Sequence, residues 1–161
     1  MAPEHTDAGT GNVAAPMFMG EFRHKLDPKR RLTVPSGWRA AIGDSKQVVV
    51  IPRLTAKHLF VFAPHVFQAQ VEKIKSSASA SPERRDYMRM VSSRSELLHW
   101  DVQGRIRIRD ELLARAQIDE DLVLVGAYEW FEIWSPAAWL EKTAATSESG
   151  VTQFVEDLGK F

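Results

Sequence analysis

The residues with the clearest potential for chemistry lie in the stretch LDPKRRLTVP, at residues 26–35. Asp27 is followed closely by three cationic side chains, those of Lys29, Arg30 and Arg31. An aspartate that begins a tight turn accepts hydrogen bonds from backbone N–H groups and can pair with an arginine across the turn. The cationic side chains beside it could bind the phosphates or the base edges of DNA.

A second stretch, WDVQGRIRIR at residues 100–109, has the same acid-to-arginine spacing. Asp101 stands four residues before Arg105, and Arg107 and Arg109 follow at intervals of two. Alternate residues of a strand share a face, so we expect these three guanidinium groups in one row, with the isoleucines between them packed inward. A two-stranded ribbon fits the major groove of DNA, where arginine can donate two hydrogen bonds to guanine.

Each motif also has a purely structural interpretation. The two aspartates could act only as clamps for their turns, and Arg107 and Arg109 could be edge-strand charges that block pairing with another chain. We favour a DNA contact for Arg31 and Arg105 because the motif occurs twice in one chain.

These motifs belong to a repeat. The matching stretches, displaced by 74 residues in the first two cases and by 72 in the third, are LDPKRRLTVP with WDVQGRIRIR, VVVIP with LVLVG, and FVFAPHVF with EIWSPAAW. Two copies are too few for a solenoid, so we predict a pseudo-twofold pair of halves. In each copy, the apolar pattern and the turn residues predict a strand, a turn, a strand, a short helix, a hairpin and a further helix.

The expected elements can be placed along the chain. In the first copy they are strands at 19–26 and 31–34, a helix at 35–43, a hairpin of 47–51 with 58–62, and a helix from Pro64. In the second copy they are strands at 95–100 and 105–108, a helix at 110–117, a hairpin of 121–126 with 130–134, and a helix from Pro136. Alternation directs Leu32 and Val34 inward and Arg31 and Thr33 outward.

The remaining segments lie outside the two copies. We expect a disordered arm (1–16), a first domain (20–66), a helical linker (67–94), a second domain (95–138) and a helical tail (139–161). Within the linker, a flexible Ser/Ala stretch precedes a helix that starts at Ser81 and Pro82. In the tail, the spacing of Val151, Phe154, Val155 and Leu158 is typical of one amphipathic helix.

Composition limits the class of protein. The chain has 161 residues, no cysteine, a formal net charge of +0 and 44% apolar residues, which favours a globular protein of a reducing cytosol without disulfides or thiolate-bound metal. No apolar run is long enough to span a bilayer, and residues 1–16 do not resemble a secretory signal. The charge is unevenly spread, with six basic residues against one acid at 23–39 and seven acids against one arginine at 110–132; opposed patches of this kind steer partners.

The sequence lacks the common patterns of a catalytic or metal site. Of the five histidines, only His58 and His65 are close in sequence, and seven residues is not the spacing of a helical metal site. The sequence contains no nucleophile elbow and no Gly-rich phosphate loop followed by lysine. We therefore expect no enzyme, no cofactor and no metal.

The stretches MFMGEFRHKLDPKRRLTVPSGWR and LHWDVQGRIRIRDELLARA, with FVFAPHVF and EIWSPAAW, resemble the MraZ family of bacterial transcriptional regulators. The resemblance implies a mixed α/β, mainly β fold, in which two tandem AbrB-like swapped-hairpin halves form a pseudo-twofold intramolecular dimer with short flanking helices. It also implies a ring-like homo-oligomer that binds direct repeats in double-stranded DNA upstream of its own division and cell-wall gene cluster. Such a protein would be cytoplasmic and nucleoid-associated, with no membrane partner.

Carried onto this sequence, the resemblance favours the first motif for DNA contact. The expected DNA-binding residues are Arg31, Lys29, Arg30, Arg105 and Arg107, and the expected turn-structuring residues are Asp27, Asp101 and Gly104. Arg30 stands where the family usually has glycine, and because a side chain disfavours positive φ, we expect a different or strained first turn. Arg109 stands where proline is usual, which leaves the start of the following helix open.

An alternative is an oligomeric assembly or partner-binding module, including an antitoxin-type protein, without specific DNA recognition. The acidic segment at 110–132 and exposed apolar groups such as Trp130, Trp134 and Trp139 would then contact other proteins. Such tryptophans are, however, more often core or subunit-interface residues. Variants of Arg31 and Arg105 that leave the biological effect intact would favour this alternative.

Overall fold

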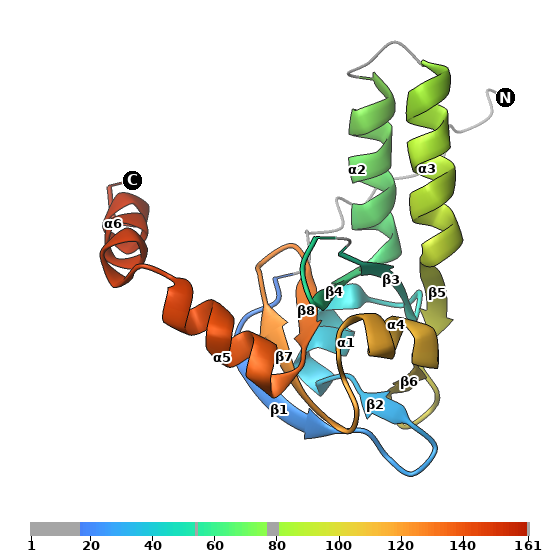
Figure 1. The fold of residues 1–161 in the computed structure, drawn as a ribbon, viewed down its shortest axis with the longest axis horizontal. Helices are drawn as coiled ribbons and strands as arrows, with labels where there is room; N and C mark the ends of the chain where they lie inside the picture. Colours follow the sequence, from blue (N-terminus) through green and yellow to red (C-terminus); the bar gives the residue numbers. More distant parts are fainter. Residues whose placement is uncertain (1–16, 54, 77–80, 161) are drawn as a thin grey trace, which may run out of the picture.

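The computed structural model describes residues 17–53, 55–76 and 81–160 (Figure 1). The arm at 1–16 and the Ser/Ala stretch at 77–80, for which we predicted disorder and flexibility, lie outside the described residues. The strands are β1 (Glu21–Lys25), β2 (Arg31–Thr33), β3 (Gln47–Pro52), β4 (His58–Phe62), β5 (Glu96–His99), β6 (Arg105–Arg107), β7 (Asp121–Gly126) and β8 (Phe131–Trp134). The helices are α1 (Ser36–Ile42), α2 (Pro64–Ser76), α3 (Pro82–Arg94), α4 (Asp110–Arg115), α5 (Pro136–Ala145) and α6 (Glu148–Leu158).

The strand order has the symmetry of the repeat. An antiparallel sheet runs β1-β7-β8-β4-β3-β5, and β2 and β6 form a separate antiparallel ribbon. If each strand is replaced by its counterpart in the other copy (β1 by β5, β3 by β7, β4 by β8 and β2 by β6), both strand orders are reproduced in reverse. Strand β1 of the first copy pairs with β7 of the second, and β5 of the second pairs with β3 of the first. Each copy therefore completes its sheet with a strand of the other, which confirms the predicted pair of swapped halves.

The core lies between one face of the larger sheet and a layer formed by the β2–β6 ribbon, α1 and α4 (Figure 1). The side chains predicted to point inward from the two motifs are Leu32, Val34, Ile106 and Ile108, and each is at most 1% exposed. They pack in one cluster with alternate residues of the central strands. Burial of these faces holds the ribbon against the body of the protein, so that its opposite face is turned outward.

Both short helices follow the predicted pattern. Helix α1 is followed by Gly43, whose φ of 87° is a left-handed conformation that glycine adopts readily. Helix α4 begins at Asp110 although Arg109 replaces the usual proline. The backbone of Arg109 (φ −56°, ψ 140°) nearly matches that of Pro35 (φ −51°, ψ 136°). The helix start that the sequence left open is therefore the same in both copies.

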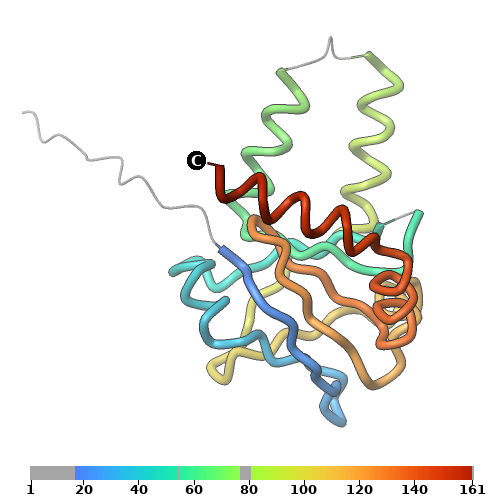
Figure 2. Tube along the Cα trace, turned by 90° about the vertical axis from the view of Figure 1, so that its left-hand side faces the viewer, coloured from blue at the N-terminus to red at the C-terminus, as the bar shows by residue number. Residues whose placement is uncertain are grey.

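The longer helices lie outside this core. In Figures 1 and 2, α2 and α3 stand side by side and project from the sheet. The hydroxyl groups of Ser81 and Ser135 cap α3 and α5 by accepting hydrogen bonds from backbone N–H groups at 3.2 and 3.1 Å. The tail contains the expected amphipathic helix, α6. No helix among the described residues is both long and apolar enough to cross a bilayer.

The tryptophans considered above as exposed contact groups are largely enclosed. Trp134 is only 5% exposed and stacks on His58 with ring centroids 4.0 Å apart. Trp130 and Trp139 are half-buried. The indole N–H groups of Trp130 and Trp134 both donate to the carboxylate of Glu132, at 3.1 and 2.8 Å. The interpretation of Trp134 as an exposed group is therefore wrong, since it packs within its own chain.

Candidate nucleic-acid interface

The β2–β6 ribbon presents three arginines on its outer face. In its register, Arg31 lies opposite Arg107, and Arg105 lies opposite Thr33. The central pair of the ribbon is buried in the core, so alternation turns these four side chains outward. The fold thus brings Arg31 of the first motif beside Arg107 of the second, which sequence distance alone does not suggest.

In the first motif, Asp27 binds both the main chain and the side chain of Arg31. Its Oδ1 accepts a hydrogen bond from the Arg31 backbone N–H at 2.7 Å, and its Oδ2 accepts one from Nε at 2.7 Å. Desolvation raises the pKa of Asp27, but the hydrogen bonds from Arg31 outweigh it and lower the pKa below its ordinary value. The carboxylate therefore stays ionised and fixes the position of the Arg31 guanidinium.

The second motif has the same contacts. Oδ1 of Asp101 accepts from the backbone N–H groups of Gln103 and Arg105 at 2.9 and 3.0 Å, and Oδ2 accepts from Nε of Arg105 at 2.8 Å. These hydrogen bonds, led by the one from the Arg105 side chain, lower the pKa of Asp101 to about 2. Arg105 is held more tightly than Arg31, because its Nη2 also lies 2.8 Å from Asp101 and its Nη1 lies 3.9 Å from Asp27.

The backbone of the two turns is equivalent despite their different sequences. Arg30 has φ 58° where its counterpart Gly104 has φ 78°. The first turn is therefore not rearranged, and Arg30 bears the strain, which costs about 1–2 kcal/mol for a residue with a side chain. Contacts of the Arg30 guanidinium with Asp110 at 2.7 Å and with the carbonyl of Asp119 at 3.2 Å offset part of that cost.

Asp110 is a member of this site that the motifs did not reveal. Its carboxylate accepts hydrogen bonds from Nε of Arg30 at 2.7 Å and from Nη2 of Arg107 at 3.2 and 3.3 Å. The hydrogen bond from Arg30, followed by that from Arg107, lowers the pKa of Asp110. Arg107 and Asp110 are close in sequence, but a strand-to-helix junction has no fixed side-chain geometry, and the contact with Arg30 spans 80 positions.

Arg109 does not extend the row of arginines. Strand β6 ends at Arg107, and the Nε of Arg109 instead lies 2.9 Å from the Glu96 carboxylate on β5. The backbone N–H of Arg109 donates to the same carboxylate at 3.1 Å. The predicted row of three guanidinium groups is therefore wrong, and Arg105 and Arg107 are its only members from β6.

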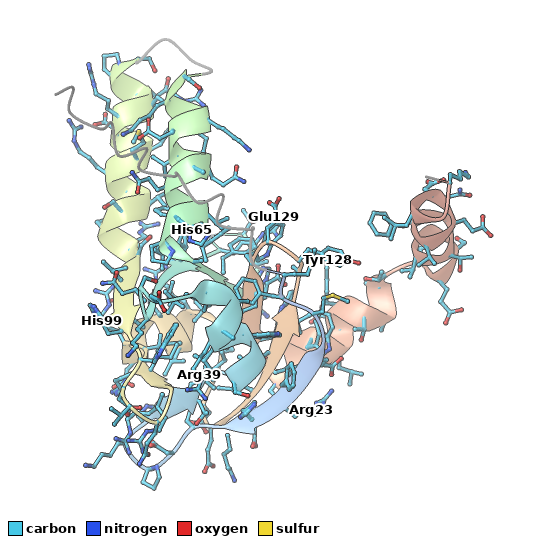
Figure 3. All side chains as sticks on the ribbon, turned by 180° about the vertical axis from the view of Figure 1, so that it is seen from behind. Arg23, Arg39, His65, His99, Tyr128 and Glu129 are labelled. Atoms are coloured by element: carbon cyan, nitrogen blue, oxygen red, sulfur yellow. The ribbon has the colours of Figure 1, made fainter. Side chains whose placement is uncertain are left out.

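Arg39 joins the two copies at the second turn. It extends from α1 (Figure 3), and a Cβ atom added to Gly104 would lie 2.4 Å from its Cζ. The Nε of Arg39 donates to the Val34 carbonyl at 3.1 Å, and the Val34 N–H donates to the Gly104 carbonyl at 2.9 Å. Gly104 is thus favoured chiefly by its positive φ, and a side chain there would also displace the Arg39 guanidinium from its hydrogen bond to Val34.

The first turn carries more free positive charge than the second. Lys29 is exposed at its tip, and within the part of the chain that the structure describes it forms no ion pair. The equivalent residue of the second turn is Gln103. Within residues 17–53, 55–76 and 81–160, no three His, Asp or Glu side chains gather closely enough to hold a metal ion. The arrangement can bind anions by charge and by arginine hydrogen bonds.

Comparison with known proteins agrees with the internal repeat. The family described as MraZ protein, antitoxin-like, matches the chain twice, at residues 17–89 and 93–159. The chain is 35% identical to the Transcriptional regulator MraZ of Oenococcus oeni, over 90% of this chain and 99% of that protein. It is 36% identical to that of Kocuria rhizophila over 83% of this chain and 94% of that protein, and 37% identical to one from Desulfitobacterium hafniense over 76% and 84%. With two copies of the domain, the swapped halves and relatives matched over nearly their full length, this chain belongs to the MraZ family.

Proposed function

We infer that the chain is a DNA-binding transcriptional regulator that binds direct repeats upstream of its own division and cell-wall gene cluster. The observation that supports this most directly is the outward face of the β2–β6 ribbon, with three arginines and with Lys29 and Arg30 at its first turn. A two-stranded ribbon has the width of a DNA major groove. The relatives' names as transcriptional regulators agree with this function, which would operate in the cytoplasm, on the nucleoid.

The first motif is the better candidate for reading bases. Arg31 donates to Asp27 through its backbone N–H and Nε, which leaves both Nη groups for guanine or phosphate. Arg105 already uses Nε and Nη2 on Asp101. A guanidinium that is fixed before binding loses less conformational entropy when DNA arrives. In this proposal Arg31 reads the base, Lys29 contacts phosphate, and Arg30, Arg105 and Arg107 supply charge around them.

The formal net charge of +0 predicts modest affinity for a single site. We propose that the chain assembles into a ring-like homo-oligomer, which would present several ribbons to several repeats. Such a ring would gain affinity through effective concentration, provided that the repeats have the spacing of the ribbons. A probe with three repeats should therefore bind much more tightly than a probe with one.

The test is fluorescence anisotropy with the DNA upstream of the gene and with a shuffled probe, across a salt series. Lys29→Ala should weaken binding to both probes and reduce the salt slope by about 1. Arg31→Lys retains the charge but loses the guanidinium fork, and should weaken binding to the specific probe by about 1–3 kcal/mol. Lys57→Ala is the matched control, because it removes an exposed lysine from the turn between β3 and β4, outside the ribbon.

The same experiment can reject the proposal. Equal and weak binding to the specific and shuffled probes would show that the charges form a solvated turn. If regulation in cells also survived the loss of Arg31 and Arg105, the chain would be an assembly or antitoxin-type module instead.

A further inference from the structure

The C-terminal helix α6 exposes its entire apolar stripe. Val151, Phe154, Val155 and Leu158 are 51%, 54%, 59% and 52% exposed. They recur at positions i, i+3, i+4 and i+7, so they lie on one side of the helix. In Figure 1, α6 stands clear of the sheet. A contiguous apolar stripe that runs along an exposed helix is typical of a site that binds another protein.

A groove with matching character lies between α2 and α3. Phe67 and Val71 line it from α2, Met88 and Val91 from α3, and Leu97 from β5. Leu97 is 58% exposed, and Met88 and Val91 are 37% and 39% exposed. The volume of the groove, about 1130 Å³, exceeds the range of about 300–1,000 Å³ that is typical of small-molecule sites. Its size and its two helical walls suit an amphipathic helix laid into it.

The charges of the two surfaces are complementary. Helix α3 has four arginines against two acids, and α2 has two lysines against one acid. Helix α6 contains three acids and no basic residue, and they are Glu148, Glu156 and Asp157. Opposite charges around an apolar contact favour this pairing and select its orientation. The same acids would repel an anionic membrane surface, which makes lipid a poorer occupant of the stripe.

We propose that α6 of one chain binds in the α2–α3 groove of a second copy. Helix α5, which leads into α6, packs on β7 near one edge of the sheet, whereas the floor of the groove is at the opposite edge, on β3 and β5. Joining two different surfaces of identical chains gives a head-to-tail contact, which closes into a ring when its rotation allows. This inference rests on the proposed assembly of several chains and identifies the contact that would hold it together.

Photo-crosslinking of the full chain tests the contact without DNA. Met88 is replaced by p-benzoylphenylalanine, the protein is irradiated, and crosslinked peptides are identified by mass spectrometry. We expect a covalent dimer in which position 88 is joined to residues 148–158. Phe154→Asp should abolish this dimer, whereas Ser149→Asp, which adds the same charge to the first turn of α6 on the side opposite the stripe, should leave it unchanged.

Sedimentation velocity of the unmodified chain separates this proposal from the proposed assembly. If the chain sediments as an oligomer but position 88 is crosslinked to residues outside α6, or is not crosslinked at all, the proposed docking is wrong. The proposed assembly would then still hold. Crosslinks from position 88 to α6 only within one chain would mean that the helix folds back on its own groove. Binding to anionic vesicles that depends on Phe154, without the crosslink, would assign α6 to lipid. A chain that sediments as a monomer would overturn both proposals, while specific binding to a single-repeat probe could still hold.

Discussion

Asp110→Asn should increase the affinity of the chain for DNA and steepen its salt dependence. The carboxylate of Asp110 accepts hydrogen bonds from Arg30 and Arg107, and its low pKa keeps it ionised at neutral pH. It therefore neutralises part of the surface that would face DNA phosphates. Since its side chain is 64% exposed, solvent screens its ion pairs, and its loss should leave the urea midpoint nearly unchanged.

The size of the effect depends on how many arginines become able to contact DNA phosphates when the Asp110 charge is removed. Each additional phosphate contact adds about 0.9 to the slope of log K against log salt, so freeing Arg30 and Arg107 should steepen the slope by roughly 1 to 2. For two unit charges about 4 Å apart in water, the interaction corresponds to roughly a fivefold change in a binding constant. The affinity should therefore rise about fivefold at a fixed, moderate salt concentration.

Anisotropy titrations of Asp110→Asn against Glu111→Gln measure this directly. Glu111 also lies in the first turn of α4, but it pairs at 3.7 Å with Arg115 of the same helix and not with an arginine of the ribbon. Both variants lose one charge from the same helix turn, so a general electrostatic effect would change them equally. If the two variants have the same slope and affinity, Arg30 and Arg107 do not face DNA. Weaker binding by Asp110→Asn would mean that Asp110 positions the arginines for contact instead of competing with DNA.

Three further predictions concern stability. Gly104→Ala should destabilise the fold by about 1–2 kcal/mol in urea unfolding, because φ 78° strains an L-residue and the new Cβ displaces the Arg39 guanidinium from the Val34 carbonyl; an unchanged midpoint would refute this. The pKa of Asp101 is about 2 when folded against an ordinary 3.8, so its stabilising effect is complete above pH 3.8 and is lost as the pH falls toward 2; Asp101→Asn should flatten the acid-unfolding curve in that window. Burial lowers the pKa of His58 below 6.5, although Glu132 opposes the shift, so stability should fall as the pH drops below 6.5, and melting temperatures of His58→Phe should not show this dependence.

The interactions within each motif could be predicted from sequence because they are local. An aspartate four residues before an arginine, with a turn between them, can reach both its N–H and its guanidinium whatever the rest of the chain does. The alternation around Leu32 and Ile106 likewise directs those side chains inward and the arginines outward, because a strand has a period of two. The secondary-structure elements were predicted from short local patterns of this kind, and the repeat and the family resemblance were recognised because the same short patterns recur.

The sequence by itself determined the repeat, the two acid–arginine turns and the faces of the strands. Only the tertiary structure decided which cations stay free, because burial of apolar faces is non-directional and leaves many pairings of surface charges nearly equal in energy. The packing of one copy on the other brought Arg30 to Asp110 across 80 positions and placed Arg39 over Gly104, and packing within the second copy joined Arg109 to Glu96. None of these contacts has a fixed spacing along the chain, since each depends on how two separate elements pack on the shared core.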